Sequence, residues 1–104
     1  MNKPLKIAPW VVPNDLQAIY DYHRVLSLAK AERILDEYDR IIALLDFNPL
    51  LFHEREGGWR VYPFASGTYL LYYKELDSMG LVAGLFHARR SPLWICEQLT
   101  ARDR

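Results

Sequence analysis

The 104-residue sequence predicts an α+β fold with the element order β-α-α-β-β-β. Two observations lead the prediction: apolar side chains at helical spacing between residues 28 and 45, and short runs rich in tyrosine and leucine after the glycine pair at 57 and 58. Helices followed by closely spaced strands are typical of an antiparallel sheet with a helical hairpin packed on one face. The content of 51% hydrophobic and 25% charged residues predicts a single folded domain over residues 1–104.

The first predicted strand covers residues 5–12, which are rich in β-favouring side chains. Pro4 and Pro9 lack the backbone N–H that a strand donates, so this strand is expected at a sheet edge or with an irregularity. A helix is expected to follow at once, because Asn14 suits an N-cap and Asp15 suits the positive end of a helix.

The second helix has the clearest periodicity in the chain. Ser27 is expected to cap its first turn, and Asn48-Pro49 is expected to end it. A break at Val25-Leu26 separates the two helices, which are therefore expected to form an antiparallel hairpin. The apolar stripe consists of Leu28, Ala31, Ile34, Leu35, Tyr38, Ile41, Ile42 and Leu45.

Three further strands are predicted, over residues 59–62, 68–75 and 81–87. The connections between them are short and rich in turn residues, which favours an antiparallel meander. The tail, residues 91–104, is expected to form a short terminal helix or a loose end. On this view, one face of the sheet stays uncovered and is available to a partner peptide.

Charge and cysteine content argue against several classes of protein. Thirteen basic and thirteen acidic residues leave no formal net charge, whereas a general nucleic-acid binder usually carries a basic excess. The single cysteine, Cys96, allows neither an internal disulfide nor a cysteine metal cluster. We expect no signal peptide and no membrane-spanning run, and therefore a cytoplasmic protein without membrane contact, metal or cofactor.

Several motifs, taken in order, resemble the RelE/ParE superfamily of toxins from type II toxin–antitoxin systems. The resemblance covers nearly the whole chain, and its signature lies between Gly58 and Pro92. The matching motifs are Asp15-Leu16 to Tyr22, Ala31-Glu32-Arg33-Ile34 to Leu45, Asn48-Pro49, Trp59-Arg60-Val61-Tyr62-Pro63, Tyr69 to Tyr73, and Leu85 to Pro92 with its His87-Ala88-Arg89-Arg90 core.

The resemblance implies a toxin that arrests growth and serves functions such as plasmid stabilisation. RelE-like members cut mRNA on the ribosome, whereas ParE-like members poison DNA gyrase without established nuclease chemistry. Both kinds are neutralised by a cognate antitoxin, and contact with DNA is expected only through that antitoxin. A third alternative is a relative of the toxin fold that has lost its activity and only binds partners.

The nuclease alternative requires a base, an acid and a cationic clamp around one phosphate. The candidates are Glu54 or Glu56 as base, Arg60 or Arg89 as clamp and His87 as acid. Two departures count against this alternative. The centre strand, Tyr69 to Tyr73, lacks the basic residue that nuclease members tend to carry, and the chain lacks their basic character.

The gyrase alternative requires an exposed binding surface and no catalytic set. The ending from His87 to Pro92 looks more ParE-like than RelE-like, so gyrase inhibition is the favoured prediction. Tryptophan and arginine dominate the energies of protein interfaces. The candidate residues for binding the target or the antitoxin are Trp59, Arg60, Arg89, Arg90 and Trp94.

Each candidate also has an ordinary structural explanation. His87 is equally suited to hydrogen-bond a buried carbonyl, and Arg60 to pair with Glu54 or Glu75. Arg89 and Arg90 also fit an ordinary solvated turn. The two remaining histidines, at positions 23 and 53, are expected to be plain surface residues.

Overall fold

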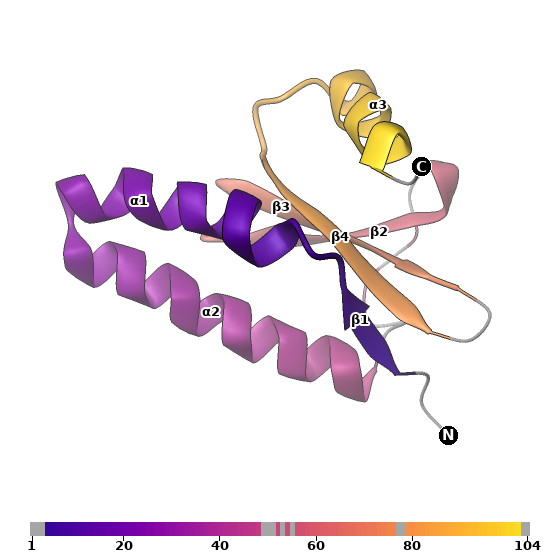
Figure 1. Ribbon diagram of the computed structural model, residues 1–104, viewed down its shortest axis with the longest axis horizontal. Coiled ribbons are helices and arrows are strands. Elements are labelled where there is room, and N and C mark those ends of the chain that lie inside the picture. Colours follow the sequence, from indigo (N-terminus) through magenta and orange to yellow (C-terminus); the bar gives the residue numbers. More distant parts are fainter. Residues whose placement is uncertain (1–3, 49–51, 53, 55, 77–78, 103–104) are drawn as a thin grey trace.

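The computed structural model describes residues 4–48, 52, 54, 56–76 and 79–102. The predicted order of elements is confirmed, with one helix added at the end of the chain (Figure 1). The elements are β1 (Leu5–Ile7), a π-helical segment η1 (Val11–Leu16), α1 (Gln17–Leu26), α2 (Leu28–Phe47), a short 3-10 turn η2 (Glu56–Gly58), β2 (Trp59–Phe64), β3 (Tyr69–Glu75), β4 (Gly80–His87) and α3 (Pro92–Arg102).

The four strands form one sheet in the order β1-β4-β3-β2. Strands β2, β3 and β4 pair antiparallel, as the short connections predict. Strand β1 pairs parallel with β4, and the helical hairpin with β2 and β3 supplies the long connection that a parallel pair needs. The predicted antiparallel sheet is therefore confirmed for the meander, and β1 adds a parallel edge strand.

The first strand is shorter than predicted, and Asn14 is not an N-cap. Strand β1 ends at Ile7, and the chain turns into η1 from Val11 onward. The reason is a tertiary contact: the Trp10 indole Nε1 donates a hydrogen bond to the carbonyl of Ala83 at 2.6 Å. Val11 is fully buried in the core and Trp10 is partly buried against it, so these tertiary contacts override the preference of both residues for a strand.

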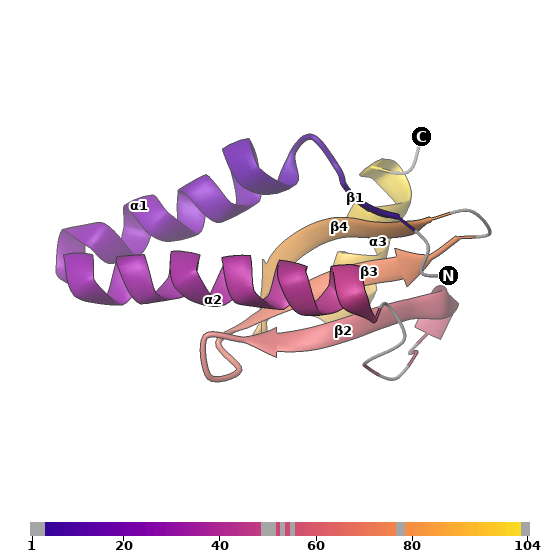
Figure 2. The same cartoon turned by 90° about the horizontal axis from the view of Figure 1, so that it is seen from below.

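The helical hairpin covers one face of the sheet (Figure 2). The predicted apolar stripe of α2 is confirmed from Ala31 to Leu45, but Leu28, its first predicted member, is 54% exposed and lies outside the core. Ser27 caps α2 as expected, with its Oγ accepting a hydrogen bond from the Lys30 backbone N–H at 3.2 Å. Helix α2 ends at Phe47, so the predicted stop is confirmed at Asn48. The buried residues that α2 contributes are Ala31, Ile34, Tyr38, Ile41 and Leu45.

Helix α3 packs on the opposite face of the sheet, so the prediction of an uncovered face is wrong for the area beneath this helix. Figures 1 and 2 show the sheet between the hairpin and α3. Ile95 and Leu99 lie one turn apart and are each only 1% exposed. They pack against Val61, Tyr72, Ala83 and Phe86, which form a second, smaller core.

Strand β2 continues through Pro63 to Phe64, past the predicted end. It is the outer strand of the sheet, where proline is tolerated. The predicted turn follows it, with Ala65 and Ser66 in the left-handed region at φ of 53° and 58°. The carboxylate of Glu37 on α2 holds this turn, because its Oε1 accepts a hydrogen bond from the Ala65 N–H at 3.0 Å.

Candidate functional site

The turn between β4 and α3 carries most of the predicted binding residues. His87 ends β4, and its Nδ1 accepts a hydrogen bond from the backbone N–H of Arg89 at 3.0 Å. The N–H of Arg90 donates to the His87 carbonyl at 3.0 Å. His87 thus binds the backbone of its own turn and not the buried carbonyl that the ordinary explanation suggests. The turn that presents the two arginines is fixed by these bonds.

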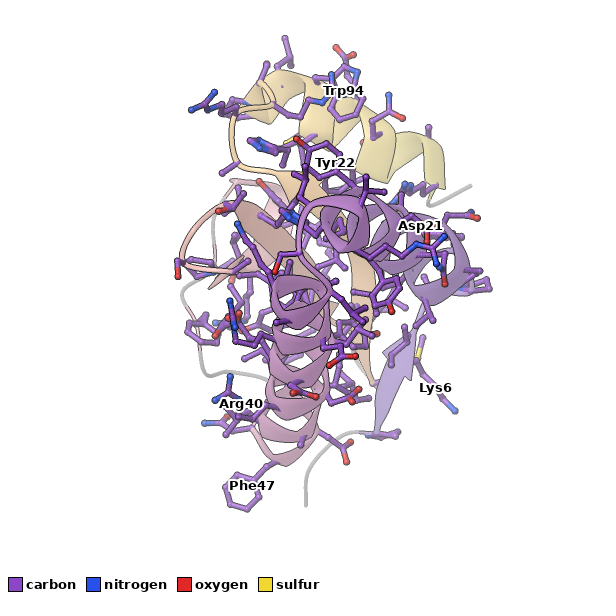
Figure 3. The ribbon with its side chains drawn as sticks, turned by 90° about the vertical axis from the view of Figure 1, so that its left-hand side faces the viewer. Lys6, Asp21, Tyr22, Arg40, Phe47 and Trp94 are labelled. Carbon is purple, nitrogen blue, oxygen red and sulfur yellow. The ribbon has the colours of Figure 1, made fainter. Side chains whose placement is uncertain are left out.

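The two arginines of this turn are exposed to solvent. Among the residues that the structure describes, neither guanidinium has a carboxylate partner. The Arg90 guanidinium lies 4.8 Å from the ring centroid of Trp94, which is labelled in Figure 3 and is 37% exposed. The other contact of the Trp94 ring is with the Phe86 ring of the sheet, edge-on at a centroid distance of 6.0 Å. Ser91 supports the start of α3, because its Oγ accepts a hydrogen bond from the Trp94 N–H at 3.3 Å. Arginine, tryptophan and an exposed helix start therefore form one surface.

An apolar groove of about 530 Å³ adjoins this surface. It lies between α3 and strand β3, and the exposed residue Arg90 is one of those that line it. Helix α3 thus covers only part of this face and leaves a groove beside it. The other residues that line the groove are Leu70, Tyr72, Ala88, Pro92, Ile95 and Cys96.

A largely buried ion pair, with side-chain exposures of 26% for Arg102 and 9% for Asp15, fixes α3 to the rest of the molecule. Arg102 donates from both terminal nitrogens to the carboxylate of Asp15, at 2.8 and 2.9 Å. The guanidinium also lies within 5.8 Å of the Trp10 ring centroid and 5.1 Å of the Phe86 ring centroid. At Gly84 a Cβ would come within 2.7 Å of both the Arg102 Nη1 and the Phe86 ring, so a larger residue there would have to displace these two side chains.

Sequence reasoning missed this pair because its members are 87 residues apart and no spacing links them. Asp15 was expected only to favour the positive end of a helix. The structure gives its carboxylate a different use, since it accepts hydrogen bonds from Arg102 and from the Leu85 N–H at 3.1 Å. The pair belongs to the framework that positions α3, and it lies on the wall of a second, smaller hollow next to His87.

The opposite end of the sheet holds Trp59, Arg60 and Glu54. The Arg60 guanidinium donates a hydrogen bond to the carbonyl of Phe52 at 2.5 Å. The backbone of Glu54 forms an isolated antiparallel bridge with that of Arg60. Trp59 packs against the second core, and the Lys74 ammonium lies 5.2 Å from its ring centroid. These contacts tie the segment before β2 to the sheet.

The structure separates the predicted nuclease residues. Arg60 pairs with Tyr73 across β2 and β3, whereas His87 pairs with Tyr69 across β3 and β4. Tyr69 and Tyr73 are four residues apart on one strand, which corresponds to roughly 13 Å. Glu54 and Arg60 thus lie at one end of the sheet and His87 at the other, so they do not surround a single phosphate. The side chain of Glu56 and all of His53 lie outside the described residues.

His23 is buried, at 6% exposure, so the prediction of a surface histidine is wrong. Its Nε2 lies 2.9 Å from the hydroxyl of Tyr69, and the Tyr69 ring packs edge-on against His87 at a centroid distance of 5.4 Å. Burial, with a smaller effect from the charge of Lys30, lowers the pKa of His23. Burial raises the pKa of Tyr69. A neutral histidine and tyrosine therefore connect the helical hairpin to the β4–α3 turn.

A helical hairpin and a third helix, α3, on opposite faces of a four-stranded sheet define a small α+β domain. A chain of the solved structure titled "Chromosomal ParDE TA system from P. aeruginosa" superposes with a TM-score of 0.70, and the match covers 84% of this chain and 97% of that one. The two are 19% identical, so the likeness shows the fold. No curated protein matches the sequence.

A family profile described as "ParE toxin of type II toxin-antitoxin system, parDE" matches residues 12–92. The chain therefore belongs to the ParE toxin family. The match spans the hairpin and the meander and ends at Pro92, where α3 begins. In the described part of the chain, no helix has both the length and the apolar content that crossing a membrane requires.

Proposed function

We propose that this ParE-family toxin inhibits DNA gyrase by binding it and is neutralised by a cognate antitoxin. The observation that carries the proposal is the β4–α3 surface. Arg89 and Arg90 are exposed there without carboxylate partners among the described residues, next to the exposed ring of Trp94. Such a surface suits recognition of another protein, since arginine and tryptophan are the residue types that anchor interfaces.

The hydrogen bonds within the β4–α3 turn support the same proposal. Because His87 holds the backbone of Arg89, the two arginines are presented by an ordered turn, and little conformational entropy is lost when a partner binds. No proton transfer is required of the surface. The separation of Glu54 and Arg60 from His87 along the sheet counts in the same direction, because it weakens the case for a nuclease centre.

The groove beside α3 is the site that we assign to the antitoxin. Its walls are apolar and its edge carries Arg90, so it suits a segment with apolar side chains followed by acidic ones. A segment that is disordered alone can fold as it fills such a groove. Contact with DNA then comes through the antitoxin, and this chain needs no basic excess of its own.

The test is a supercoiling assay with purified gyrase and the double variant Arg89→Ala/Arg90→Ala. The wild-type toxin is expected to inhibit supercoiling and to induce a DNA-damage response, and the variant is expected to be about tenfold weaker. Lys6→Ala/Arg40→Ala removes the same charge from exposed positions elsewhere and is expected to retain inhibition. Unaffected supercoiling at excess wild-type toxin contradicts the gyrase proposal.

Cleavage of mRNA remains the alternative, and one observation favours it: His87 and Arg89, an acid and a cation, lie in the same turn. In that case messages on translating ribosomes are cut during growth arrest, and His87→Ala abolishes the cuts. Intact messages during arrest reject this alternative. Harmless expression of folded protein rejects both toxic activities and favours an inactive binding module.

A further inference from the structure

Two hollows adjoin one another in a row beyond the groove beside α3. The first, which we call the polar hollow, has a volume of about 260 Å³ and shares Ala88 with the groove. The second, the α2 hollow, has a volume of about 570 Å³ and shares Ser66 and Thr68 with the polar hollow. Both lie at the end of the sheet where β2 and β4 finish (Figure 1). The groove and the two hollows therefore form one path from α3 to the outer side of α2.

The polar hollow is lined by hydrogen-bond donors, and none of its described residues is acidic. The β2–β3 and β4–α3 turns meet there, because the Ala88 N–H donates to the Thr68 carbonyl at 2.9 Å. His87 accepts the Arg89 N–H at Nδ1, so the neutral imidazole carries its proton on Nε2 and is a donor there. The lining residues are Ser66, Gly67, Thr68, His87, Ala88 and Arg89. A guanidinium, an imidazole N–H and two hydroxyls together suit an anion such as a carboxylate.

The α2 hollow adds three exposed cations, Lys30, Arg33 and Arg40, against two carboxylates. None of these cations has a carboxylate within ion-pair distance in the part of the chain that the structure describes. The carboxylate of Glu37 is already engaged, because its two oxygens accept hydrogen bonds from a tyrosine hydroxyl of β2 and from the backbone of the following turn, each at 3.0 Å. The other carboxylate, that of Asp36, is exposed. The cations therefore outnumber the carboxylates, and no ion pair neutralises them.

Continuity with the apolar groove indicates which anion fits. A single nucleic-acid strand binds by stacking its bases on aromatic rings, and no tryptophan, tyrosine or phenylalanine is among the described residues that line the two hollows. A polypeptide whose apolar side chains fill the groove beside α3, by contrast, reaches the polar hollow directly past Ala88. Acidic side chains next to the apolar ones then meet a row of polar and cationic residues. We call this row the cationic tract, and it consists of Lys30, Arg33, Ser66, Thr68, His87 and Arg89.

On the basis of the proposed function, we infer that the cationic tract binds an acidic stretch of the antitoxin, adjacent to the apolar stretch in the groove beside α3. Arg89 belongs both to the tract and to the surface that we assign to gyrase, so an antitoxin bound here excludes gyrase from that surface. Neutralisation is then direct competition. Attraction between opposite charges accelerates the association of the two proteins, and salt weakens this attraction.

The experiment compares Lys30→Glu with Lys6→Glu, because both lysines are exposed. Lys6 pairs with Leu81 at the opposite end of β4 from His87 and lines neither hollow. Lys30→Glu preserves the helix start, since a glutamate three residues after Ser27 completes a capping box. Binding of the antitoxin encoded beside the toxin gene is measured by stopped-flow kinetics and calorimetry at low and high salt.

Lys30→Glu is expected to bind the antitoxin about tenfold more weakly at low salt, mainly through slower association, and with a smaller salt dependence. Lys6→Glu is expected to bind like the wild type. Arg33→Gln removes one charge of the tract without reversing it and is expected to weaken binding by a smaller factor. Wild-type binding by Arg33→Gln contradicts the tract even if Lys30→Glu disturbs the hairpin.

Unchanged antitoxin affinity and salt dependence in Lys30→Glu overturn the inference, and so does an equal loss in Lys6→Glu. If Lys30→Glu instead loses binding of the oligonucleotide hexathymidylate while it keeps the antitoxin, the tract belongs to nucleic acid. An antitoxin that fails to bind the wild-type toxin overturns the proposed neutralisation itself. A wild-type toxin without effect on gyrase overturns the proposed target, whereas weaker antitoxin binding by Lys30→Glu still supports the tract.

Discussion

Two arginine–tryptophan pairs lie at different places on the sheet, and their surroundings differ. At the start of β2, Arg60 donates to the carbonyl of Phe52, and Trp59 packs against the second core beneath Lys74. After β4, the exposed Arg90 guanidinium lies over the Trp94 ring, which is 37% exposed and touches the sheet only at its edge-on contact with Phe86. The same residue types therefore hold the fold together at one end and are available to a partner at the other.

An arginine or a tryptophan therefore indicates an interface only when the contacts of its side chain within the molecule are known. Sequence reasoning placed Arg60 and Arg90 together among the binding candidates. The structure distinguishes them, because Arg60 already donates a hydrogen bond to the Phe52 carbonyl. If the Arg60 guanidinium turned to a partner protein, this carbonyl would lose its donor. Arg102 is a third case. Its guanidinium donates hydrogen bonds to the Asp15 carboxylate and the Ala83 carbonyl and lies near two aromatic rings.

The largest effect is expected at this third arginine. Arg102→Ala leaves the carboxylate of Asp15, whose side chain is only 9% exposed, without its cation. Breaking a largely buried pair in this way is expected to lower the free energy of unfolding by about 3 kcal/mol, measured by urea denaturation. Arg24→Ala, which removes an exposed pair with Asp21, is the control and is expected to cost less than about 0.5 kcal/mol. Equal effects of the two changes contradict the proposed role of the buried pair.

Arg60→Ala is expected to have an intermediate effect. The Phe52 carbonyl loses a charged donor, so the free energy of unfolding should fall by about 1–2 kcal/mol. Inhibition of gyrase per folded molecule should not change. If Arg60→Ala loses inhibition while its urea midpoint stays at the wild-type value, Arg60 contacts the target and does not stabilise the fold, which contradicts this assignment.

Replacing each tryptophan by alanine sharpens the same comparison. Trp94→Ala is expected to weaken gyrase inhibition about tenfold and to cost less than about 1 kcal/mol of stability. Trp59→Ala is expected to cost more stability than Trp94→Ala, because its ring packs against the second core. Titration of supercoiling inhibition, together with thermal melting, distinguishes the two variants. A larger loss of inhibition in Trp59→Ala than in Trp94→Ala contradicts the assignment of the β4–α3 end of the sheet to the target.

The smallest effect is expected from pH at the Tyr69 end of the sheet. Burial lowers the pKa of His23 in the folded state, so the unfolded chain binds a proton at a higher pH than the folded protein. The contribution of His23 to stability is therefore complete above its unfolded pKa of about 6.5 and is lost as the pH falls below that value. The melting temperature should drop between pH 7.5 and pH 5.5, and His23→Gln should reduce this drop. An equal drop in the variant assigns the pH dependence to other groups.

The parts of the fold with local signals could be predicted from the sequence. The stripe on α2, the cap at Ser27 and the meander follow from periodicity and turn residues, which act over a few positions. The early end of β1 could not be predicted, because the Trp10 hydrogen bond to Ala83 joins residues 73 positions apart. The burial of His23 depends likewise on Tyr69, 46 positions away.

The candidate site was likewise predictable only where its residues are neighbours in the sequence. The motif from His87 to Arg90 predicted one cationic turn, and the structure places these residues together. The predicted nuclease residues are divided, with Glu54 and Arg60 at one end of the sheet and His87 and Arg89 at the other, because sequence order does not show at which end of a strand a residue lies. Helix α3 was expected only as a short helix or a loose tail, since the apolar partners of Ile95 and Leu99 are supplied by strands far back in the chain.

The groove beside α3 has one property that makes its occupancy directly observable. Cys96, the only cysteine in the chain, is half-buried in the wall of this groove. A thiol-reactive fluorophore attached there needs no engineered cysteine and no removal of competing thiols. Its emission would change when an apolar segment fills the groove and displaces water from the dye. The natural sequence thus supplies a labelling position from which the arrival and departure of an antitoxin can be followed in real time.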